Sequence, residues 1–179
     1  MLTRSGRKAS QQPRELARFI QIIAGARSYL EVGARHGDTF YEVMKSLPVG
    51  SRGVAIDLPN GPWGGNSQSS LLDVANELKA LSYDIEVVFG DSQSINLGER
   101  FDVVLIDADH RYEAVKADFQ KYKQGITAFH DIAGQGIKLR EMEIGVPRFW
   151  NEIKNNFRHE EIIIQDDDRP MGIGVLWVN

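Results

Sequence analysis

The sequence predicts an α/β protein in which one mixed sheet carries helices on both faces. Strand-length apolar segments alternate with segments whose apolar residues recur at helical spacing, the pattern of parallel sheets. One of the strands, residues 101–106 (FDVVLI), is almost continuously apolar, as a central parallel strand should be. The last two strand-like segments follow each other directly, as in a hairpin. Seven such segments therefore predict a seven-stranded sheet whose last strand runs antiparallel.

Length and composition narrow the class of protein. A chain of 179 residues suits a single domain, and 42% hydrophobic with 26% charged residues is ordinary for a globular protein. A formal charge of −4 disfavours a dedicated nucleic-acid binder. The absence of cysteine excludes disulfides, thiolate metal ligands and a cysteine nucleophile. Since no secretory or membrane-length apolar stretch is found, we expect a cytoplasmic protein without a membrane span.

The elements are expected in the following order. Residues 1–12 form a flexible basic tail and 13–179 a single domain, whose first helix starts at Pro13 and stops at Gly25. Strands are predicted over residues 29–32, 52–58, 85–89, 101–106, 126–129, 160–165 and 173–178. Further helices are predicted over residues 38–48, 71–81, 112–122 and 146–156, with long loops over 59–70 and 133–146.

The glycine-bounded loop after the first strand is the clearest ligand signal. Residues 28–44 (SYLEVGARHGDTFYEVM) turn from a strand through Gly33 and Gly37 into a helix, which directs backbone N–H groups at the loop. The loop lacks the Gly-x-Gly-x-x-Gly of dinucleotide binders. Glu31 would repel a phosphate but can hold a cationic amino group. A ligand with an amino-acid end and a ribose suits this loop.

Polar residues end five of the predicted strands: Glu31, Asp57, Asp91, Asp107 and the pair His130-Asp131. Helix N-caps favour aspartate, so capping explains some of these positions. The carboxyl ends of parallel strands meet at one edge of the sheet, where open α/β sheets bind ligands. The recurrence therefore predicts a site at that edge.

Four segments resemble successive motifs of the class I S-adenosylmethionine (SAM)-dependent methyltransferases: EVGARHGDTF, VAIDL, VVFGDSQS and FDVVLIDADHRYEAVKADF. The last, together with AFHDI and GVPRFW, resembles a group of small-molecule O-methyltransferases whose members contain a divalent metal or a histidine base. The resemblance covers residues 28–179. It implies a Rossmann-like class I methyltransferase fold and O-methylation of a small hydroxylated molecule, such as a sugar, a phenol or a natural-product intermediate.

The resemblance also implies cofactor contacts. Three residues would surround the methionine moiety: Glu31, Gly33 and Gly37. Asp57 would accept hydrogen bonds from both ribose hydroxyls, because an ionised carboxylate has two acceptor oxygens. Asp91 and Ser92 would lie beside the adenine, with Asp91 accepting from its exocyclic amine. The alternative for Asp57 and Asp91 is an ordinary cap or turn residue.

Five residues would face the molecule that accepts the methyl group: Asp107, Asp109, His110, His130 and Asp131. Asp107 and Asp131 end strands predicted to be neighbours, and two converging carboxylates suit a divalent cation. Such an ion would bind the acceptor hydroxyl and lower its pKa. His110 can take the hydroxyl proton near neutral pH. The predicted catalytic residues are thus His110, Asp107 and His130.

His130 departs from the pattern of the metal-dependent relatives, which often carry an acidic residue there. Histidine is a poor Mg²⁺ ligand but is acceptable to Mn²⁺, Fe²⁺ or Zn²⁺. A softer metal, proton transfer by His130 and a metal-free site all stay open. The predicted ligands are Asp107, Asp131 and His130. Successive strand side chains point to opposite faces, so the last two share an ion only if the strand has already ended.

Several alternatives remain at this point. Trp63 either covers a ligand or packs on its own helix, and residues 133–145 form either a lid or a solvated surface. A nucleic-acid or protein methyltransferase is disfavoured by the acidic balance and by the lack of an Asn-Pro-Pro-Tyr-like segment. A non-catalytic SAM-binding module is a further alternative. A nucleotide-dependent oxidoreductase is disfavoured, because the chain lacks a phosphate-binding glycine loop. We expect a small-molecule acceptor as partner, no nucleic acid or membrane, and leave homo-oligomers open.

Overall fold

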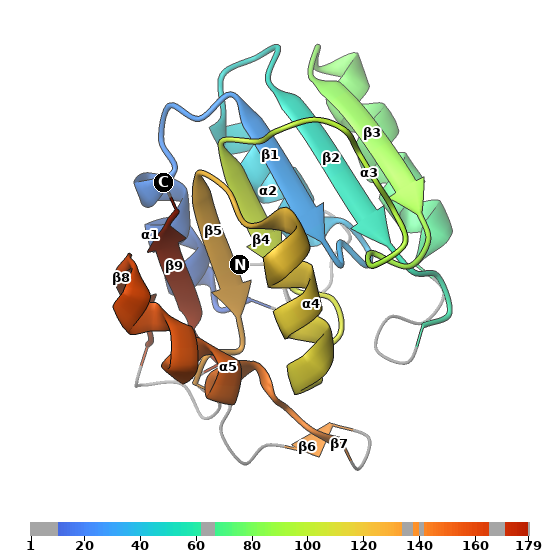
Figure 1. The fold of residues 1–179 in the computed structure, drawn as a ribbon. Helices are drawn as coiled ribbons and strands as arrows, with labels where there is room; N and C mark the ends of the chain where they lie inside the picture. Colours follow the sequence, from blue (N-terminus) through green and yellow to red (C-terminus); the bar gives the residue numbers. More distant parts are fainter. Residues whose placement is uncertain (1–10, 62–66, 134–137, 140–141, 165–170, 179) are drawn as a thin grey trace.

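The computed structural model describes residues 11–61, 67–133, 138–139, 142–164 and 171–178, and its centre is a seven-stranded sheet (Figure 1). The strands are β1 Ser28–Val32, β2 Arg52–Asp57, β3 Asp84–Phe89, β4 Val103–Ile106, β5 Ile126–His130, β8 Arg158–Ile162 and β9 Ile173–Trp177. Their order is β3-β2-β1-β4-β5-β9-β8. The first five strands are parallel, and β9 runs antiparallel between β5 and β8. The predicted mixed sheet with an antiparallel last strand is confirmed.

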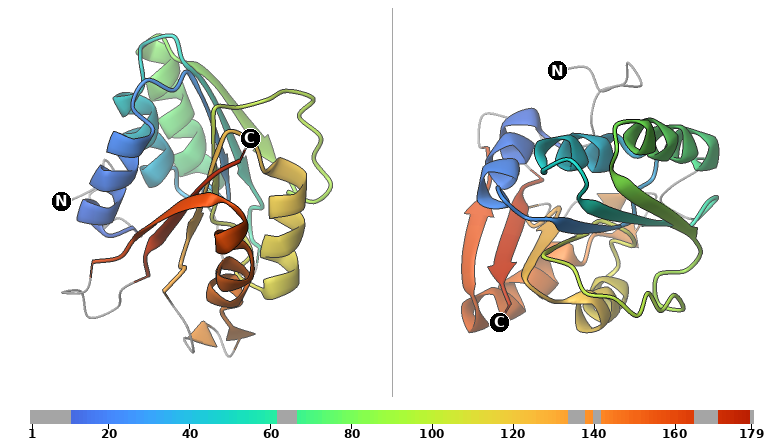
Figure 2. Two further views of the ribbon diagram at one scale, coloured as in Figure 1. Left: turned by 60° about the vertical axis from the view of Figure 1, so that its left-hand side comes forward. Right: turned by 90° about the horizontal axis from the view of Figure 1, so that it is seen from above.

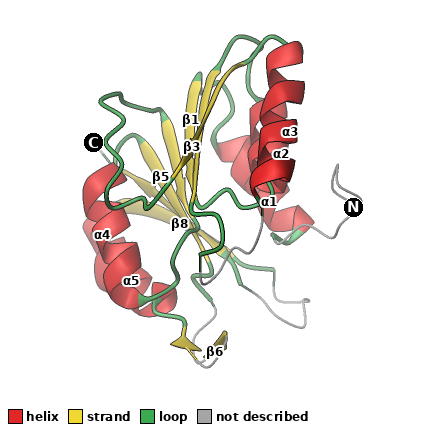
Figure 3. Ribbon diagram, turned by 90° about the vertical axis from the view of Figure 1, so that its right-hand side faces the viewer, coloured by secondary structure: helices red, strands yellow, loops and turns green. Residues whose placement is uncertain are grey.

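Helices cover both faces of this sheet (Figure 3). One face carries α1 Pro13–Ile22, α2 Asp38–Ser46 and α3 Gln68–Ala80, and the other carries α4 Tyr112–Tyr122 and α5 Val146–Ile153, which ends in the short 3-10 helix Lys154–Asn156. Figure 2 shows the same three layers from two other directions. Each helical layer closes its own apolar cluster, with Phe19 and Phe40 in one and Phe129 and Trp150 in the other. Within the described ranges, no helix is long and apolar enough to cross a membrane.

Several elements differ from the prediction by a few residues; strand β8, for example, spans Arg158–Ile162 in place of the predicted 160–165. Helix α3 begins at Gln68, three residues before the predicted start, because its polar first turn carries no apolar periodicity. The predicted loop 133–146 contains two paired strands, β6 Lys138–Leu139 and β7 Met142–Glu143. Two-residue strands are too short to show alternation in a sequence. Strand β5 extends one residue further than predicted, to His130.

The N-terminal segment joins the domain earlier than predicted. Residues 1–10 of the predicted tail lie outside the described residues. The side chain of Gln12 caps α1 by accepting from the backbone N–H groups of Arg14 and Glu15. Gln11 is only 3% exposed. Gln11 and Gln12 therefore belong to the folded domain and not to the predicted tail of residues 1–12.

Gly33 sets how closely the loop after β1 approaches the loop after β4. Its φ is +96°, and a Cβ added there would lie 2.3 Å from the carbonyl oxygen of Asp107 and 2.5 Å from Cα of Ala108. Only glycine fits both the left-handed backbone and this contact. The backbone N–H of Asp107 also donates to the carbonyl of Val32 at 2.8 Å. These contacts hold two of the predicted site loops against each other.

Gly33→Ala should therefore lower the free energy of unfolding by roughly 2–5 kcal/mol, since it adds a backbone clash to the left-handed strain. Gly50→Ala is the matched control, because Gly50 has φ +86° and no described atom within 4 Å of the added Cβ. It should cost only about 1–2 kcal/mol. Urea unfolding measures both, and equal losses would contradict the close-approach role of Gly33.

Candidate functional site

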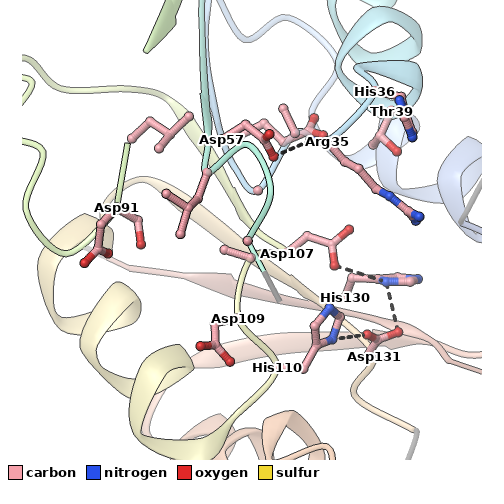
Figure 4. A pocket seen from close by; sticks show the side chains of 18 of the residues that line it. Arg35, His36, Thr39, Asp57, Asp91, Asp107, Asp109, His110, His130 and Asp131 are labelled. Atoms are coloured by element: carbon pink, nitrogen blue, oxygen red, sulfur yellow. Dashed lines mark hydrogen bonds and ion pairs between the residues drawn. The ribbon is translucent and has the colours of Figure 1, made fainter. Parts of the chain in front are cut away.

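A cavity of about 610 Å³ opens at the carboxyl edge of the sheet. Its walls come from the segments that follow β1 to β5, as expected for an open α/β sheet. Figure 4 shows Asp57 and Asp91 on one side and the cluster around His130 on another. Of the predicted site residues, all but Gly37 line it: Glu31, Gly33, Asp57, Asp91, Ser92, Asp107, Asp109, His110, His130 and Asp131. The topology thus brings together residues that are up to 100 positions apart in the chain.

Glu31 supplies a buried carboxyl group at the floor of the loop after β1. It is 2% exposed and accepts a 2.6 Å hydrogen bond from the Tyr29 hydroxyl. Burial raises the pKa of Glu31 well above its usual value, and the neighbouring carboxylates of Asp107 and Asp57 raise it further. A cation placed beside Glu31 would stabilise its ionised form, whereas the neighbouring carboxylates would repel an anion.

Gly37 has a structural position behind the cavity. It is the N-cap residue of α2, with φ 82°, and a Cβ there would lie 2.9 Å from Cδ1 of Leu71 on α3. Glycine is therefore needed for the turn into α2 and for the packing of α2 on α3.

Asp57 is held by two protein donors at the end of β2. Its Oδ1 accepts from the backbone N–H of Arg35 at 2.8 Å, and its Oδ2 accepts from Oγ of Ser67 at 2.7 Å. The residue is 5% exposed. Because each carboxylate oxygen has two lone pairs, both oxygens can still accept one further hydrogen bond.

Asp91 and Ser92 lie in the loop after β3. Oδ1 of Asp91 accepts from the backbone N–H of Gln93 at 3.0 Å, which closes an Asx turn. Oγ of Ser92 donates to Oδ1 of Asp118 on α4 at 2.7 Å. Both residues line the cavity.

Asp107, His130, Asp131 and His110 form one connected cluster (Figure 4). Nδ1 of His130 lies 3.4 Å from Oδ1 of Asp107 and 3.0 Å from Oδ1 of Asp131. Nδ1 of His110 lies 2.5 Å from Oδ2 of Asp131. One ligand atom from each of Asp107, His130 and Asp131 lies within 4.8 Å of the others. Strands β4 and β5 are neighbours, as predicted, so the two aspartates face one point.

The backbone at Asp131 explains how two successive residues reach the same space. Strand β5 ends at His130, and Asp131 has a left-handed φ of 67°. The chain therefore leaves the alternation of the strand at this position, which is the condition set by the sequence for a shared site. An aspartate tolerates this conformation better than most residues, and such strain is typical of functional positions.

The cluster is electrostatically balanced by its histidines. Burial alone would lower the pKa of His130, but the carboxylates of Asp107 and Asp131 outweigh it and raise that pKa well above its usual value. Burial of Asp131 would raise its pKa, but the charges and hydrogen bonds of His130 and His110 together outweigh burial, so that the pKa of Asp131 is lowered. The pKa of His110 is raised by Asp131 and Asp107 against its own burial. The two carboxylates therefore stabilise the protonated form of His130.

Asp109 lies apart from this cluster. Its carboxylate accepts from the backbone N–H of Arg111 at 3.0 Å and from Nε of the same residue, and Figure 4 shows it turned away from His130. Trp63 and residues 134–137 and 140–141 of the predicted lid over 133–145 lie outside the described residues.

The sequence analysis assigned no site role to three residues: Gln11, Thr39 and Asp118. Nε2 of Gln11 donates to Oδ2 of Asp107 at 2.8 Å, and the hydroxyl of Thr39 donates to Oε1 of Gln11. No pattern marks Gln11, which stands in a polar segment. Asp118 does carry a signal, since it belongs to the segment FDVVLIDADHRYEAVKADF.

Several solved structures of known proteins are similar to this chain in fold. No family model matches the chain, and no curated protein matches it. An O-methyltransferase from Bacillus cereus in complex with SAH is 16% identical with a TM-score of 0.71, covering 95% of this chain and 83% of that one. The O-methyltransferase TomG from Streptomyces achromogenes, involved in tomaymycin synthesis and solved with SAM, is 17% identical with a TM-score of 0.67, covering 96% and 82%.

The N-methyltransferase NodS from Bradyrhizobium japonicum is also similar, at 14% identity with a TM-score of 0.64, covering 91% and 90%. At such identities the likeness concerns the fold. The chain therefore has the Rossmann-like class I methyltransferase fold that its sequence predicts. The atom that is methylated differs between these neighbours, so the fold leaves it open.

Proposed function

We propose that this chain transfers the methyl group of SAM to a hydroxyl group of a small molecule. The observation that carries the proposal is one cavity with two chemically different ends. Acceptor oxygens of Asp57, Asp91 and Ser92 line one end, and the cluster of His110, His130 and two aspartates lines the other. The methyltransferase fold supports the same reading.

The cofactor contacts follow from what each wall offers. Asp57 keeps one free lone pair on each oxygen for the two ribose hydroxyls. The carboxyl-rich wall at Glu31 attracts the ammonium group and the sulfonium charge. Asp91 and Ser92 accept from the exocyclic amine of the base. When bound, SAM supplies a methyl group on sulfur, whose S–C bond breaks as the new O–C bond forms while sulfur keeps the electron pair.

The acid-base cluster suits an acceptor that must lose a proton. An amine attacks as the neutral species, whereas a hydroxyl needs a base beside it. Asp131 holds Nδ1 of His110 and so orients the imidazole that would take the hydroxyl proton. His130 keeps the carboxylates of Asp107 and Asp131 together. These contacts favour O-methylation over methylation of an amine, a nucleic-acid base or a protein side chain.

Three side chains of this cluster, those of Asp107, His130 and Asp131, fit a divalent ion. Asp107, His130 and Asp131 offer two carboxylates and one imidazole, a donor set that suits Mn²⁺, Fe²⁺ or Zn²⁺ better than Mg²⁺. Nδ1 of His130 lies beside both carboxylates and would be the ligand atom once it has lost its proton. A bound ion would supply Lewis-acid activation of the acceptor hydroxyl.

SAM or S-adenosylhomocysteine should raise the melting temperature of the protein, while NAD and ATP should not. Asp57→Ala should remove most of this shift, because losing a charged acceptor costs about 1.5–3 kcal/mol of binding. The control is Asp84→Ala, since Asp84 pairs with Arg52 outside the cavity. Equal cofactor-induced shifts in wild type and Asp57→Ala would argue against the cofactor assignment.

His110→Ala should reduce turnover by roughly 10²–10⁴-fold on an identified acceptor, because the hydroxyl then loses its base. The affinity for S-adenosylhomocysteine should stay nearly unchanged. His159→Ala, a histidine outside the cavity that contacts the carbonyl of Phe157, is the control. Normal turnover of His110→Ala would rule out this base, and a loss of stability alone would assign His110 a structural role.

Exhaustive chelation should lower turnover, and Mn²⁺ or Zn²⁺ should restore it better than Mg²⁺. The restoring ion should also raise the melting temperature of wild type but leave Asp131→Ala unchanged. Asp109→Ala should keep this response, because its carboxylate is engaged by Arg111. Full turnover of the chelated wild type would remove the metal from the mechanism and leave His110 or His130 to activate the hydroxyl.

A further inference from the structure

Asp118 is a buried carboxylate that the proposed mechanism does not use. It lies on α4 and is 1% exposed, so it is shielded almost completely from solvent. Its Oδ1 accepts the hydroxyl of Ser92 at 2.7 Å, while its Oδ2 makes no hydrogen bond within the described ranges. Burying a carboxylate is costly, so its one polar partner points to what it does.

The same helix holds the whole loop that contains Ser92. Nζ of Lys121 donates to the carbonyl oxygens of Ser92 and Gln93 at 2.9 and 2.8 Å. The hydroxyl of Tyr122 donates to the carbonyl oxygens of Ser92 and Ile95 at 2.5 and 3.2 Å. Ser92 is therefore fixed through both its backbone and its side chain, while the residue also lines the cavity.

The bond to Asp118 determines what the Ser92 hydroxyl can offer. A serine hydroxyl has one proton and two lone pairs. When the proton is donated to Asp118, Oγ of Ser92 can only accept a hydrogen bond from the cavity. Burial raises the pKa of Asp118 to about 6, with the charges of Asp91 and Asp109 adding to it and the bond from Ser92 opposing it. Above that pH the carboxylate is ionised and has no proton to return.

We propose that Asp118 is a positioning residue that keeps Ser92 a hydrogen-bond acceptor and thereby selects a cofactor base with an amino edge. This inference rests on the proposed function and adds a determinant of cofactor specificity to it. Asp91 also lines the cavity and, when ionised, is likewise only an acceptor. A base whose edge carries a carbonyl in place of the amine meets lone pairs and is rejected.

The test compares two ligands at pH 8 by calorimetry: S-adenosylhomocysteine and its 6-oxo counterpart, S-inosylhomocysteine. Wild type should bind the amino ligand at least about tenfold more tightly, because the oxo ligand leaves its acceptor unpaired. In Asp118→Ala the Ser92 hydroxyl is free to turn and donate, so the preference should fall to about threefold or less. Ser92→Ala removes the acceptor and should reduce the preference in the same way, which keeps the test open if Asp118→Ala does not fold.

Lys121→Met is the matched control for a purely structural role. It removes contacts to the same loop without touching the Ser92 hydroxyl, so both affinities should fall together and their ratio should stay at the wild-type value. An unchanged ratio in both Asp118→Ala and Ser92→Ala would overturn the inference and leave the proposed function standing. Failure of wild type to bind either ligand would overturn both.

Discussion

Carboxylate side chains from several parallel strands meet at one edge of this sheet, and their mutual repulsion has to be balanced inside the protein. The carboxylates of Asp107 and Asp131 are drawn together by the imidazolium of His130. Glu31 responds differently, because burial among acidic neighbours raises its pKa and its hydrogen bond comes from Tyr29. A cation bound beside Glu31 would stabilise its ionised form, as the histidines stabilise the aspartates.

The backbone provides the geometry for this balance. Gly33 allows the loops after β1 and β4 to touch, which brings Asp107 beside the glycine loop. The left-handed turn at Asp131 lets successive side chains reach one point after β5. Both features lie at the carboxyl edge of the sheet, where the chain reverses from strand to helix. The charges at this edge are therefore positioned by a few unusual backbone conformations.

Helix α4 connects the two ends of the cavity. It begins directly after the segment that carries Asp107 and His110, and its last two turns hold the loop with Asp91 and Ser92. The loop with Asp91 and Ser92 and the cluster with Asp107 and His110 are therefore attached to one helix. In the proposed reaction the cofactor spans these two ends, so this helix would fix the distance between them.

The sequence by itself determined the fold class, the succession of strands and helices along the chain, and ten of the residues that line the cavity. These features follow from local patterns: helical and strand periodicity, and a polar residue at the end of each parallel strand. The tertiary structure decided how those residues are paired. The bond of Gln11 to Asp107 joins positions 96 apart, and that of Ser92 to Asp118 joins positions 26 apart. It also decided that His130 and Asp131 share one space, because a left-handed residue overrides the alternation of a strand. Such contacts depend on how distant segments pack, and no local pattern of residues encodes that packing.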